Sequence, residues 1–299
     1  MATDVGAGRY APSPTGDLHL GNLRTAVLAW LFARSTGRRF LLRNEDLDAS
    51  RVRPGLAARQ LADLTALGVT FDDLPVVQSE RGDAYRSALA AIADRTYECF
   101  CSRKEIAEAA SAPHGVQHYP GTCRNLSDLE RVERRRTRSP ALRLRADGAR
   151  QTVHDLLHGE VSGTVEDFVV RRNDGVAAYN LAVVVDDAAS GVDQVVRGDD
   201  LLPAAINQAY LASVLGAAPP TYAHVPLAVN ADGRRLAKRD GAVTVPDLAA
   251  VGVDATAVLA LIAESLGLPA PRRLPDLLTS FDPDSLPRDP WVFPVNRTR

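Results

Sequence analysis

The chain has 299 residues and a mass of 32.1 kDa, which is long enough for two domains and a sizeable buried core. Its 35 basic and 37 acidic residues give a formal net charge of -2 and an isoelectric point near 6.3. This balance excludes an overall positive field that would attract nucleic acid, so a nucleic-acid partner would need a local basic surface. The N-terminus lacks a signal-peptide pattern, and no run approaches the roughly 20 apolar residues that span a bilayer. We therefore expect a cytoplasmic protein without a membrane partner.

The first predicted elements are a short strand ending near Tyr10, a loop, and a helix over residues 21–35. The first N–H groups of a helix have no intrahelical partner and attract anions, so such a loop can deliver a nucleotide to the helix N-terminus. His19 stands just before the helix and can donate a hydrogen bond to a phosphate oxygen. Gly21 has no Cβ, so a flat adenine or ribose can approach the backbone there. Taken alone, the same residues also fit an ordinary Pro/Gly turn with a surface histidine.

Strands and helices then alternate along the chain. A strand over 39–43 and a helix near 54–67, ended by Gly68, follow the first helix. Later segments of the same kind are strands at 167–171, 182–185 and 194–197 and a helix near 203–215. This alternation predicts an α/β fold with a doubly wound, mostly parallel sheet that all these strands complete.

The region after Val225 predicts a turn and a helix. Asn230-Ala-Asp-Gly233 is typical of a tight turn, and an apolar-striped helix follows with Asp254 as its N-cap and Gly267 as its end. Between turn and helix lies Arg235-Leu-Ala-Lys-Arg239. Lys104 and Lys238 are the two lysines among 35 basic residues. A compact ammonium on a flexible stem suits a phosphate contact, although Lys238 alone also fits a surface lysine without function.

The segment from Cys99 to about Arg145 reads as an insertion that carries all three cysteines, Cys99, Cys101 and Cys123. An odd number of closely spaced cysteines argues against disulfides and for a metal or reduced thiols. Three thiolates and one further ligand would form a closed structural zinc site. On chemistry alone the fourth ligand would be His118, because imidazole binds zinc more often than phenolate does.

Two further patterns fit a structural explanation better than a functional one. His154 and His158 have the helical spacing of a zinc pair, but no H-E-x-x-H glutamate accompanies them and the segment fits a polar turn. A run of arginines could grip RNA phosphate, but we favour the solvated face of a helix paired with Glu130 and Glu133. The arginines of this run are Arg131, Arg134, Arg135, Arg136 and Arg138.

Five polar residues fall at the ends of predicted strands, where open α/β sheets bind their ligands. They are Arg9, Ser13, Glu45, Tyr179 and Arg197. Arginine forks grip carboxylates and a glutamate can hold an ammonium, so the set would suit a dicarboxylic amino acid. Each residue alone also fits a surface ion pair or a helix cap.

Six motifs together resemble the catalytic core of class I glutamyl-tRNA synthetases, from about Arg9 to Leu268. They are R-Y-A-P-S-P-T-G-D-L-H-L-G-N, L-L-R-N-E-D-L-D, V-V-Q-S-E-R, A-Y-N-L-A-V-V-V-D-D, V-V-R-G-D-D-L-L and R-L-A-K-R. The resemblance implies a Rossmann-like sheet, catalytic roles for His19 and Lys238, and glutamate binding by the five residues at the strand ends. It also implies an ATP site, whose residues are Pro12, Thr15, Gly16, His19, Gly21, Asn22 and Lys238.

The chain also departs from that family. Asn22 replaces the second histidine of the first signature, and Arg235 and Ala237 replace a lysine and a serine of the signature loop. Full glutamyl-tRNA synthetases continue into a helical anticodon-binding domain, whereas this sequence ends at Arg299. In this respect it resembles the glutamyl-queuosine tRNA(Asp) synthetases, a family of short paralogues.

The metal signature of these paralogues implies zinc ligation by Cys99, Cys101, Tyr119 and Cys123, with His118 as the alternative to Tyr119. The implied division is a first half of the catalytic domain at 1–97, a zinc-containing insertion at 98–166, and a second half at 167–224. A stem-contact-like, mainly helical region with the signature loop would occupy 225–299.

The implied reaction is activation of L-glutamate with ATP and Mg²⁺, followed by transfer to queuosine in the anticodon of tRNA(Asp), by a monomer with one structural Zn²⁺. Two alternatives stay open. One is a truncated glutamyl-tRNA synthetase that charges tRNA(Glu). The other is a non-catalytic RNA-binding paralogue that kept the fold and the zinc site.

Overall fold

The computed structural model describes residues 5–102, 104–106, 119–236 and 244–293. The strands are β1 (Ala7–Tyr10), β2 (Arg39–Asn44), β3 (Val76–Val77), β4 (Thr96–Cys99), β5 (Ala141–Leu144), β6 (Arg150–Asp155), β7 (Gly159–Thr164), β8 (Val169–Arg171), β9 (Val192–Gly198), β10 (Thr221–Val225), β11 (Ala228–Val229) and β12 (Trp291–Val292). The α-helices are α1 (Leu20–Ser35), α2 (Leu56–Ala66), α3 (Gly82–Ala91), α5 (Asp128–Arg135), α6 (Tyr179–Ala189), α7 (Leu202–Val214), α8 (Val245–Ala250) and α9 (Ala255–Ser265).

A seven-stranded sheet forms the centre of the molecule, with the strand order β3-β2-β1-β9-β10-β6-β7. All neighbouring strands in it run parallel except β6 and β7, which form an antiparallel hairpin at one edge. The chain builds outward from β1 in one direction and then returns to place β9 on the other side. The strand order therefore reverses between β1 and β9, and such a switch point opens a crevice at the carboxyl ends of the two strands.

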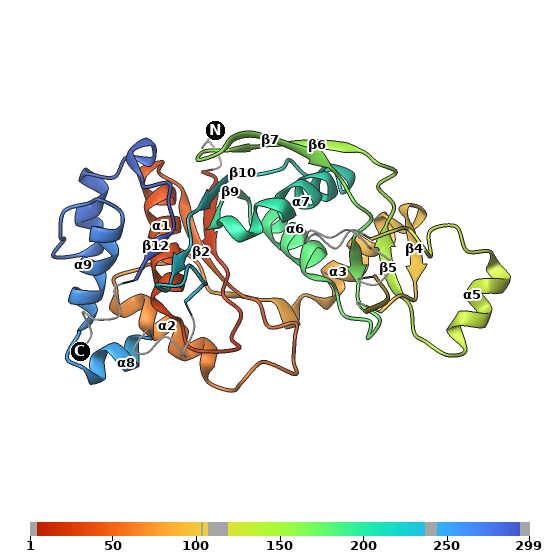
Figure 1. Cartoon of the computed structure of the whole chain (residues 1–299), viewed down its shortest axis with the longest axis horizontal. Helices are drawn as coiled ribbons and strands as arrows, with labels where there is room; N and C mark the ends of the chain where they lie inside the picture. The colour runs from red at the N-terminus through yellow and green to blue at the C-terminus, as the bar shows by residue number, and fades with distance from the viewer. Residues whose placement is uncertain (1–4, 103, 107–118, 237–243, 294–299) are drawn as a thin grey trace.

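Helices cover both faces of the sheet (Figure 1). On one face α1 packs on β1 and β9, and α9 packs on the outer side of α1. The apolar side chains of this layer belong to one buried cluster that also takes in Leu64 of α2 and Leu248 of α8. On the other face α6 and α7 pack against each other, and they share a second cluster with Tyr85 of α3. The core thus consists of two apolar layers separated by the sheet.

A separate three-stranded antiparallel sheet, with the order β4-β5-β8, lies at the far side of α6 from α1 (Figure 1). Helix α5 projects from this part and forms one end of the molecule. Its N-cap is Ser127, whose hydroxyl accepts a hydrogen bond from the backbone N–H of Glu130 while the Glu130 side chain accepts from Ser127 N–H. Such a reciprocal cap stabilises a helix that contributes no buried residue.

Most of the predicted elements are confirmed. The expected α/β fold with a mostly parallel sheet is present, and α1, β2, α2, β9 and α7 lie within a few residues of their predicted ranges. Gly233 closes the predicted turn with a left-handed φ of 73°, where a Cβ would be strained. Asp254 caps α9 by accepting a hydrogen bond from Ala257 N–H, and Gly267 follows the end of that helix.

Two strand predictions were wrong. Residues 182–185 lie inside α6, because the helix is buried on most sides and a helix without a polar face carries the same apolar run as a buried strand. Tyr179 is consequently the first residue of a helix and not the end of a strand. Residues 169–171 do form a strand, β8, but it pairs with β5 in the three-stranded sheet and not with the main sheet.

The predicted division of the chain at 97, 166 and 224 remains a prediction. Within the 98–166 segment, however, β6 and β7 join the edge of the main sheet through the pairing of Asp155 with Tyr222. The C-terminal segment carries α8, α9 and a 3-10 turn at Leu274–Thr279, which packs on α1.

Candidate active site and cysteine cluster

A cavity of about 470 Å³ lies at the carboxyl ends of β1 and β9, at the switch point of the sheet. It collects residues from seven separate parts of the sequence, at 9–25, 45, 60, 179, 196–201, 227–228 and 235. The predicted site residues that line it are Arg9, Pro12, Ser13, Thr15, Gly16, His19, Gly21, Asn22, Glu45, Tyr179 and Arg197. The structure therefore brings the predicted ATP-binding and glutamate-binding residues into one site, except for Lys238, which lies outside the described residues.

One side of the cavity is held by a buried network of charges. Asp187 of α6 accepts from Arg9 Nε at 3.3 Å and also bonds Arg43, which donates to Glu45 Oε1 at 3.1 Å. Burial raises the pKa of Asp187, but the two guanidinium groups outweigh burial and hold that pKa below its ordinary value. Burial raises the pKa of Glu45 on balance, despite the neighbouring Arg43 and Arg9. An ammonium group of a ligand beside Glu45 would favour its ionised form.

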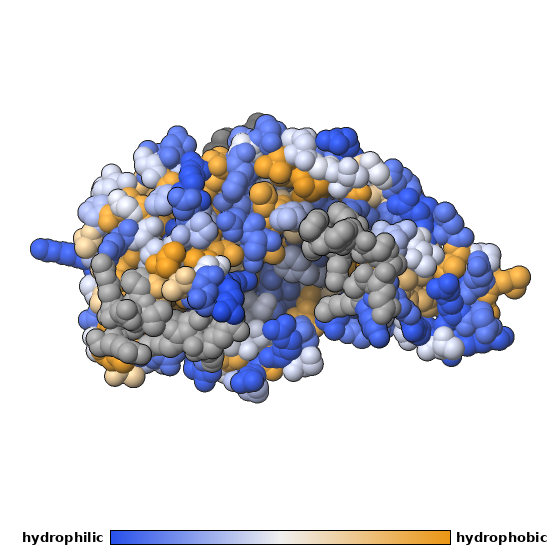
Figure 2. Space-filling model, viewed as in Figure 1, coloured by the Kyte–Doolittle hydropathy of each residue, from blue (hydrophilic) through white to orange (hydrophobic). Residues whose placement is uncertain are grey.

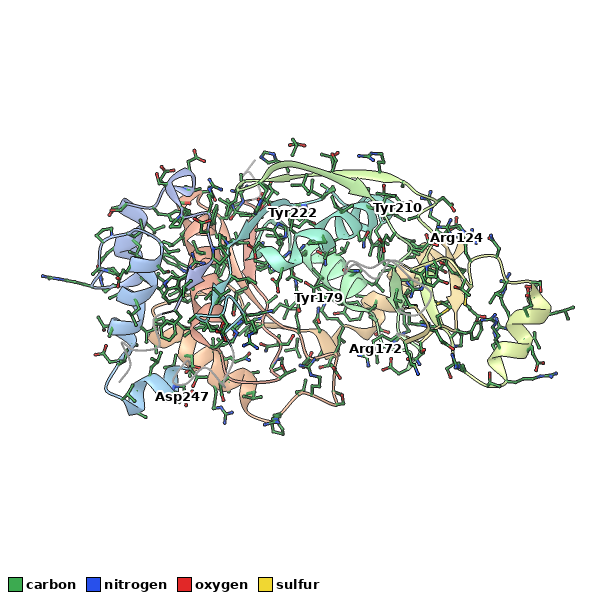
Figure 3. All side chains as sticks on the ribbon, viewed as in Figure 1. Arg124, Arg172, Tyr179, Tyr210, Tyr222 and Asp247 are labelled. Carbon is green, nitrogen blue, oxygen red and sulfur yellow. The ribbon has the colours of Figure 1, made fainter. Side chains whose placement is uncertain are left out.

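Arg197 forms another side of the cavity and is 5% exposed. Its guanidinium donates to His224, Gln208 and the backbone carbonyl of Leu201. Tyr179 lies between the main sheet and the three-stranded sheet (Figure 3) and is 42% exposed. Ser13, Glu45 and Tyr179 also line a second hollow, of about 1060 Å³, that reaches Cys99 and Cys101. Three of the five residues predicted to bind glutamate, Ser13, Glu45 and Tyr179, thus line both cavities.

His19 is the N-cap of α1. Its Nδ1 accepts a hydrogen bond from Asn22 N–H at 3.3 Å, and the Asn22 side chain accepts from His19 N–H. Burial, with the positive charge of Arg235 as a second cause, lowers the pKa of His19 to about 4. The imidazole is therefore neutral at pH 7, and because Nδ1 is an acceptor, the proton must reside on Nε2. The ring presents one N–H donor beside the N-terminus of a helix, which suits a phosphate oxygen.

Gln60 of α2 holds the loop before α1 in place. Its side-chain amide donates hydrogen bonds to the carbonyls of Ser13 and Gly16 at 3.1 and 2.7 Å. Pro12 contributes its carbonyl to Glu45 N–H, which ties the loop to the end of β2. A Cβ on Gly21 would lie 3.1 Å from the imidazole of His19 and from Ala228. The imidazole of His19 therefore already lies close to the backbone of Gly21. The missing side chain at Gly21 makes room for His19 as well as for the predicted nucleotide.

The second signature segment borders the same cavity. Arg235 lines the cavity and donates to Asp200 at 3.0 Å, and Thr244 pairs with His19 through an isolated antiparallel bridge. Residues 237–243 lie outside the described residues, so the role of Lys238 stays a prediction.

Sequence reasoning missed the side chains that hold the site together. Asp187 and Arg43 connect Arg9 with Glu45 in the cavity, Gln60 supports the loop, and His224 and Gln208 hold Arg197. One signal was present for Asp187, because two aspartates that follow directly on a run of five apolar residues are expected to have buried partners.

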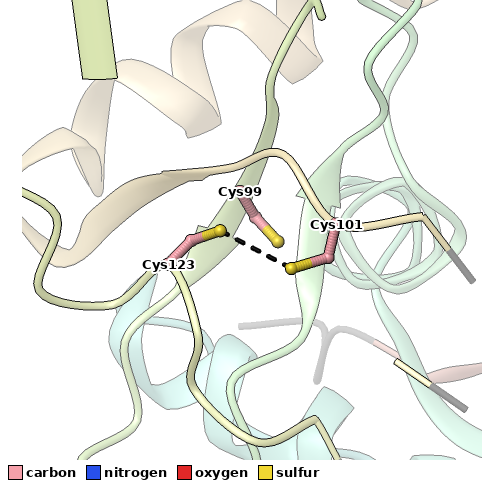
Figure 4. Close-up of side chains that lie close together, drawn as sticks. All are labelled: Cys99, Cys101 and Cys123. Carbon is pink, nitrogen blue, oxygen red and sulfur yellow. Dashed lines mark hydrogen bonds between the residues drawn. The ribbon is translucent and has the colours of Figure 1, made fainter. Parts of the chain in front are cut away.

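The three cysteines point toward one another near the end of β4 (Figure 4). Their sulfur atoms all lie within 4.8 Å of one another, and the distance from Cys101 Sγ to Cys123 Sγ is 3.6 Å. Tyr119 Oη lies 3.5 Å from Cys99 Sγ and accepts a hydrogen bond from Cys123 N–H at 2.9 Å. His118 lies outside the described residues. Three sulfur atoms therefore lie together, with the phenolic oxygen of Tyr119 beside one of them.

The structure agrees only in part with the structural explanations given for the two patterns set aside in the sequence. His154 lies in β6 and pairs with Glu160, whereas His158 lies in the following turn and contacts the carbonyl of His224, so the two do not share a helix face. The arginine run lies on or just after α5, at an end of the molecule that is largely hydrophilic (Figure 2). Its pairing was only partly predicted: Arg136 pairs with Glu133, but Arg135 and Arg138 pair with Glu98 and Glu105.

Among the described residues, no helix is both long and apolar enough to cross a bilayer. Residues 7–268 match the family model of the class I tRNA synthetases (E and Q), catalytic domain. The fold and the cavity are thus those of a class I aminoacyl-tRNA synthetase catalytic core.

Two groups of relatives narrow the class. Glutamyl-Q tRNA(Asp) synthetase of Nocardia farcinica is 61% identical over 97% of this chain and 94% of that protein, and its namesake in Cutibacterium acnes is 52% identical over 88% and 76%. The solved glutamate tRNA ligase of Elizabethkingia meningosepticum, in complex with its amino acid, superposes with a TM-score of 0.83 at 25% identity, over 99% of this chain and 68% of that one. The chain belongs to the glutamyl-Q tRNA(Asp) synthetase family, which confirms the resemblance seen in the motifs.

Proposed function

We propose that this protein activates L-glutamate with ATP and transfers the glutamyl group to queuosine in the anticodon of tRNA(Asp). The supporting observation is the convergence of Arg9, Glu45 and Arg197 with the His19 end of α1 in one cavity. In this proposal Arg9, Ser13, Tyr179 and Arg197 bind the carboxylates of glutamate, and Glu45 binds its ammonium. The relatives named above carry the same activity in their names.

In the activation step, an oxygen of the glutamate α-carboxylate attacks the α-phosphorus of ATP, a P–O bond forms, and pyrophosphate leaves. No general base is required, because the nucleophile is already ionised. Catalysis then consists of positioning and of stabilising charge on the phosphate oxygens. The Nε2–H of His19 and the N-terminus of α1 supply donors from this chain, and Lys238 is proposed to supply a further cation. Mg²⁺, when bound with ATP, would neutralise phosphate charge.

The first test is ATP–pyrophosphate exchange. We expect exchange that depends on glutamate and proceeds without tRNA, since every residue assigned to activation belongs to this chain. Absence of exchange in correctly folded protein would favour the non-catalytic RNA-binding alternative. The second test is the acceptor. Charging of tRNA(Asp) that contains queuosine, and none of tRNA(Asp) lacking it, supports the proposal, whereas charging of tRNA(Glu) supports the truncated glutamyl-tRNA synthetase.

We also propose one structural Zn²⁺ at Cys99, Cys101, Cys123 and Tyr119. In a tetrahedral site with Zn–S bonds of about 2.3 Å, neighbouring sulfurs lie about 3.8 Å apart and a sulfur and an oxygen ligand about 3.5 Å apart. The observed distances of 3.6 Å between Cys101 and Cys123 and of 3.5 Å between Cys99 and Tyr119 fit these values. Four protein ligands leave no open position, so the metal would stabilise the three-stranded sheet and take no part in the reaction.

The zinc proposal predicts about one zinc per chain in protein purified without chelator. Cys123→Ser is expected to lose the metal and to be less stable, by about 4 kcal/mol if zinc normally stands at 1,000 times its Kd. Metal analysis and thermal unfolding measure both effects. His154→Ala, which removes an exposed histidine outside the cluster, is the control and should keep its zinc. Tyr119→Phe should retain zinc less well against a chelator than His118→Ala, and the opposite order would assign the fourth position to His118.

A further inference from the structure

A buried chain of three side chains crosses neighbouring strands of the main sheet. Asp155 ends β6, His224 lies on β10, and Arg197 lies opposite His224 on β9. His224 Nδ1 stands 2.6 Å from Asp155 Oδ2, and Arg197 Nε stands 3.0 Å from His224 Nε2. None of the three is more than 5% exposed. Of these three side chains only Arg197 lines the cavity. Asp155 and His224 lie behind it in the protein interior.

The hydrogen-bond chemistry fixes the protonation of every member. Arginine is a donor only, so His224 Nε2 must accept, and its proton must lie on Nδ1 and be donated to Asp155. Burial, with the charge of Arg197, keeps the pKa of His224 below its ordinary value. The other oxygen of Asp155 accepts the backbone N–H groups of Leu157 and His158 at 2.9 and 3.0 Å. These bonds leave a neutral imidazole that can serve Arg197 only as an acceptor.

The remaining contacts of Arg197 are also with neutral groups. Nη1 donates to Gln208 Oε1 at 2.7 Å and Nη2 donates to the carbonyl of Leu201 at 3.2 Å. A guanidinium has five N–H groups, so one on Nη1 and one on Nη2 remain available to a ligand. In the part of the chain that the structure describes, Arg197 forms no ion pair, whereas Arg9 on the other side of the pocket has Asp187.

We propose that Asp155 and His224 are positioning residues which, with Gln208, hold Arg197 as a cation without an ion-pair partner among the described residues, and thereby set the preference for glutamate over glutamine. This inference rests on the proposed activation of glutamate. A cation held by neutral acceptors gains most from a ligand carboxylate and little from a neutral amide. A protein carboxylate in the same position would neutralise the guanidinium before the substrate arrives and reduce that difference.

Gln208→Glu tests the charge balance directly. The variant keeps the size of the side chain and places a carboxylate where an amide oxygen now lies 2.7 Å from Arg197. Asn180, which now accepts from Gln208, can turn its amide and donate instead. In glutamate-dependent ATP–pyrophosphate exchange we expect the KM for glutamate to rise at least tenfold, while kcat changes less than threefold and the KM for ATP is unchanged. The ratio of kcat/KM for glutamate over glutamine should fall.

Asp155→Asn tests the positioning. We assume that the asparagine oxygen still accepts the N–H groups of Leu157 and His158, so that the asparagine NH₂ group faces His224 Nδ1. Nδ1 must then accept, and the imidazole proton moves to Nε2. There it meets the N–H of Arg197, and the hydrogen bond between His224 and Arg197 is lost. We expect the same selective rise in the KM for glutamate. Asp167→Asn is the matched control, because Asp167 is also buried and accepts hydrogen bonds from Arg124, Tyr97 and Ala146, beside the three-stranded sheet and away from Arg197. That control should lose stability but keep the KM for glutamate.

The outcomes separate this inference from the proposed function. A wild-type protein without glutamate-dependent exchange would overturn the proposed function. A wild-type protein with exchange, together with an unchanged glutamate KM and an unchanged glutamate-to-glutamine ratio in folded Gln208→Glu, would overturn the inference alone. Circular dichroism establishes folding, and if Asp155→Asn does not fold, the result for Gln208→Glu decides the question.

Discussion

Asp187→Ala is expected to lower the free energy of unfolding by about 3–5 kcal/mol and to remove measurable glutamate activation. Asp187 bonds both Arg9 and Arg43, and the side chains of all three residues are at least nine-tenths buried. Removing the carboxylate leaves two buried guanidinium groups with one fewer anion, and Arg43 is also the residue that holds Glu45. Chemical denaturation and ATP–pyrophosphate exchange measure the two losses.

The control for this variant is Asp193→Ala. Asp193 also accepts two bonds from one arginine, Arg38, but its side chain is 48% exposed. Exposed pairs contribute little, so this change should cost no more than about 1 kcal/mol and leave exchange intact. Equal stability of the two variants would show that the buried network contributes nothing of its own.

The pH dependence of Asp187 follows from the direction of its pKa. The folded-state pKa lies below the unfolded value of about 3.9, so the carboxylate stabilises the fold fully above that pH. This contribution is lost as pH falls through the folded-state pKa. The stability difference between the wild type and Asp187→Asn should therefore be largest near neutral pH and shrink below about pH 4.

The sequence predicted those elements of the fold whose local signals agree with their environment. A strand, a Pro/Gly loop and an apolar helix described β1 and α1 correctly, and Asp254 with Gly267 marked both ends of α9. The failure at α6 has a physical cause, because a helix enclosed by the sheet, α3 and α7 needs no polar face and loses the periodicity that distinguishes it from a strand.

Of the candidate site, the residues that line the cavity were predictable from the sequence, but the residues that hold them in place were not. The residues that line the cavity occur in short motifs, so Arg9, Glu45 and Arg197 could be named from the sequence and lie together in the structure. Their supports were not predictable, because they come from distant elements: Asp187 is 178 residues from Arg9, and His224 is 27 residues from Arg197. Such partners are set by strand order and register, which no local pattern specifies.

His19→Ala is expected to lower the rate of ATP–pyrophosphate exchange by about 10²- to 10³-fold, the usual effect of removing one preorganised donor from a developing charge. The same change removes the acceptor that caps α1, which should cost about 1 kcal/mol of stability. His19→Asn separates the two effects, because asparagine is a good N-cap but is too short to place a donor where Nε2 lies. We expect this variant to be as stable as the wild type and as slow as His19→Ala.

His19→Gln should recover part of the lost rate, since its amide N–H can reach toward the position of Nε2. The pH profile then distinguishes a neutral donor from a cation. With a free-enzyme pKa of about 4, His19 is neutral from pH 6 to 8, so kcat/KM for ATP should show no inflection from His19 in that range. The protonated form predominates in the folded protein only below that pKa. The contribution of His19 to stability falls as pH drops from about 6.5 to about 4, because the unfolded chain then binds the proton more readily, and it changes no further below about 4. A loss of kcat/KM on raising the pH through about 6.5, present in the wild type and absent in His19→Gln, would instead assign His19 the role of a cation.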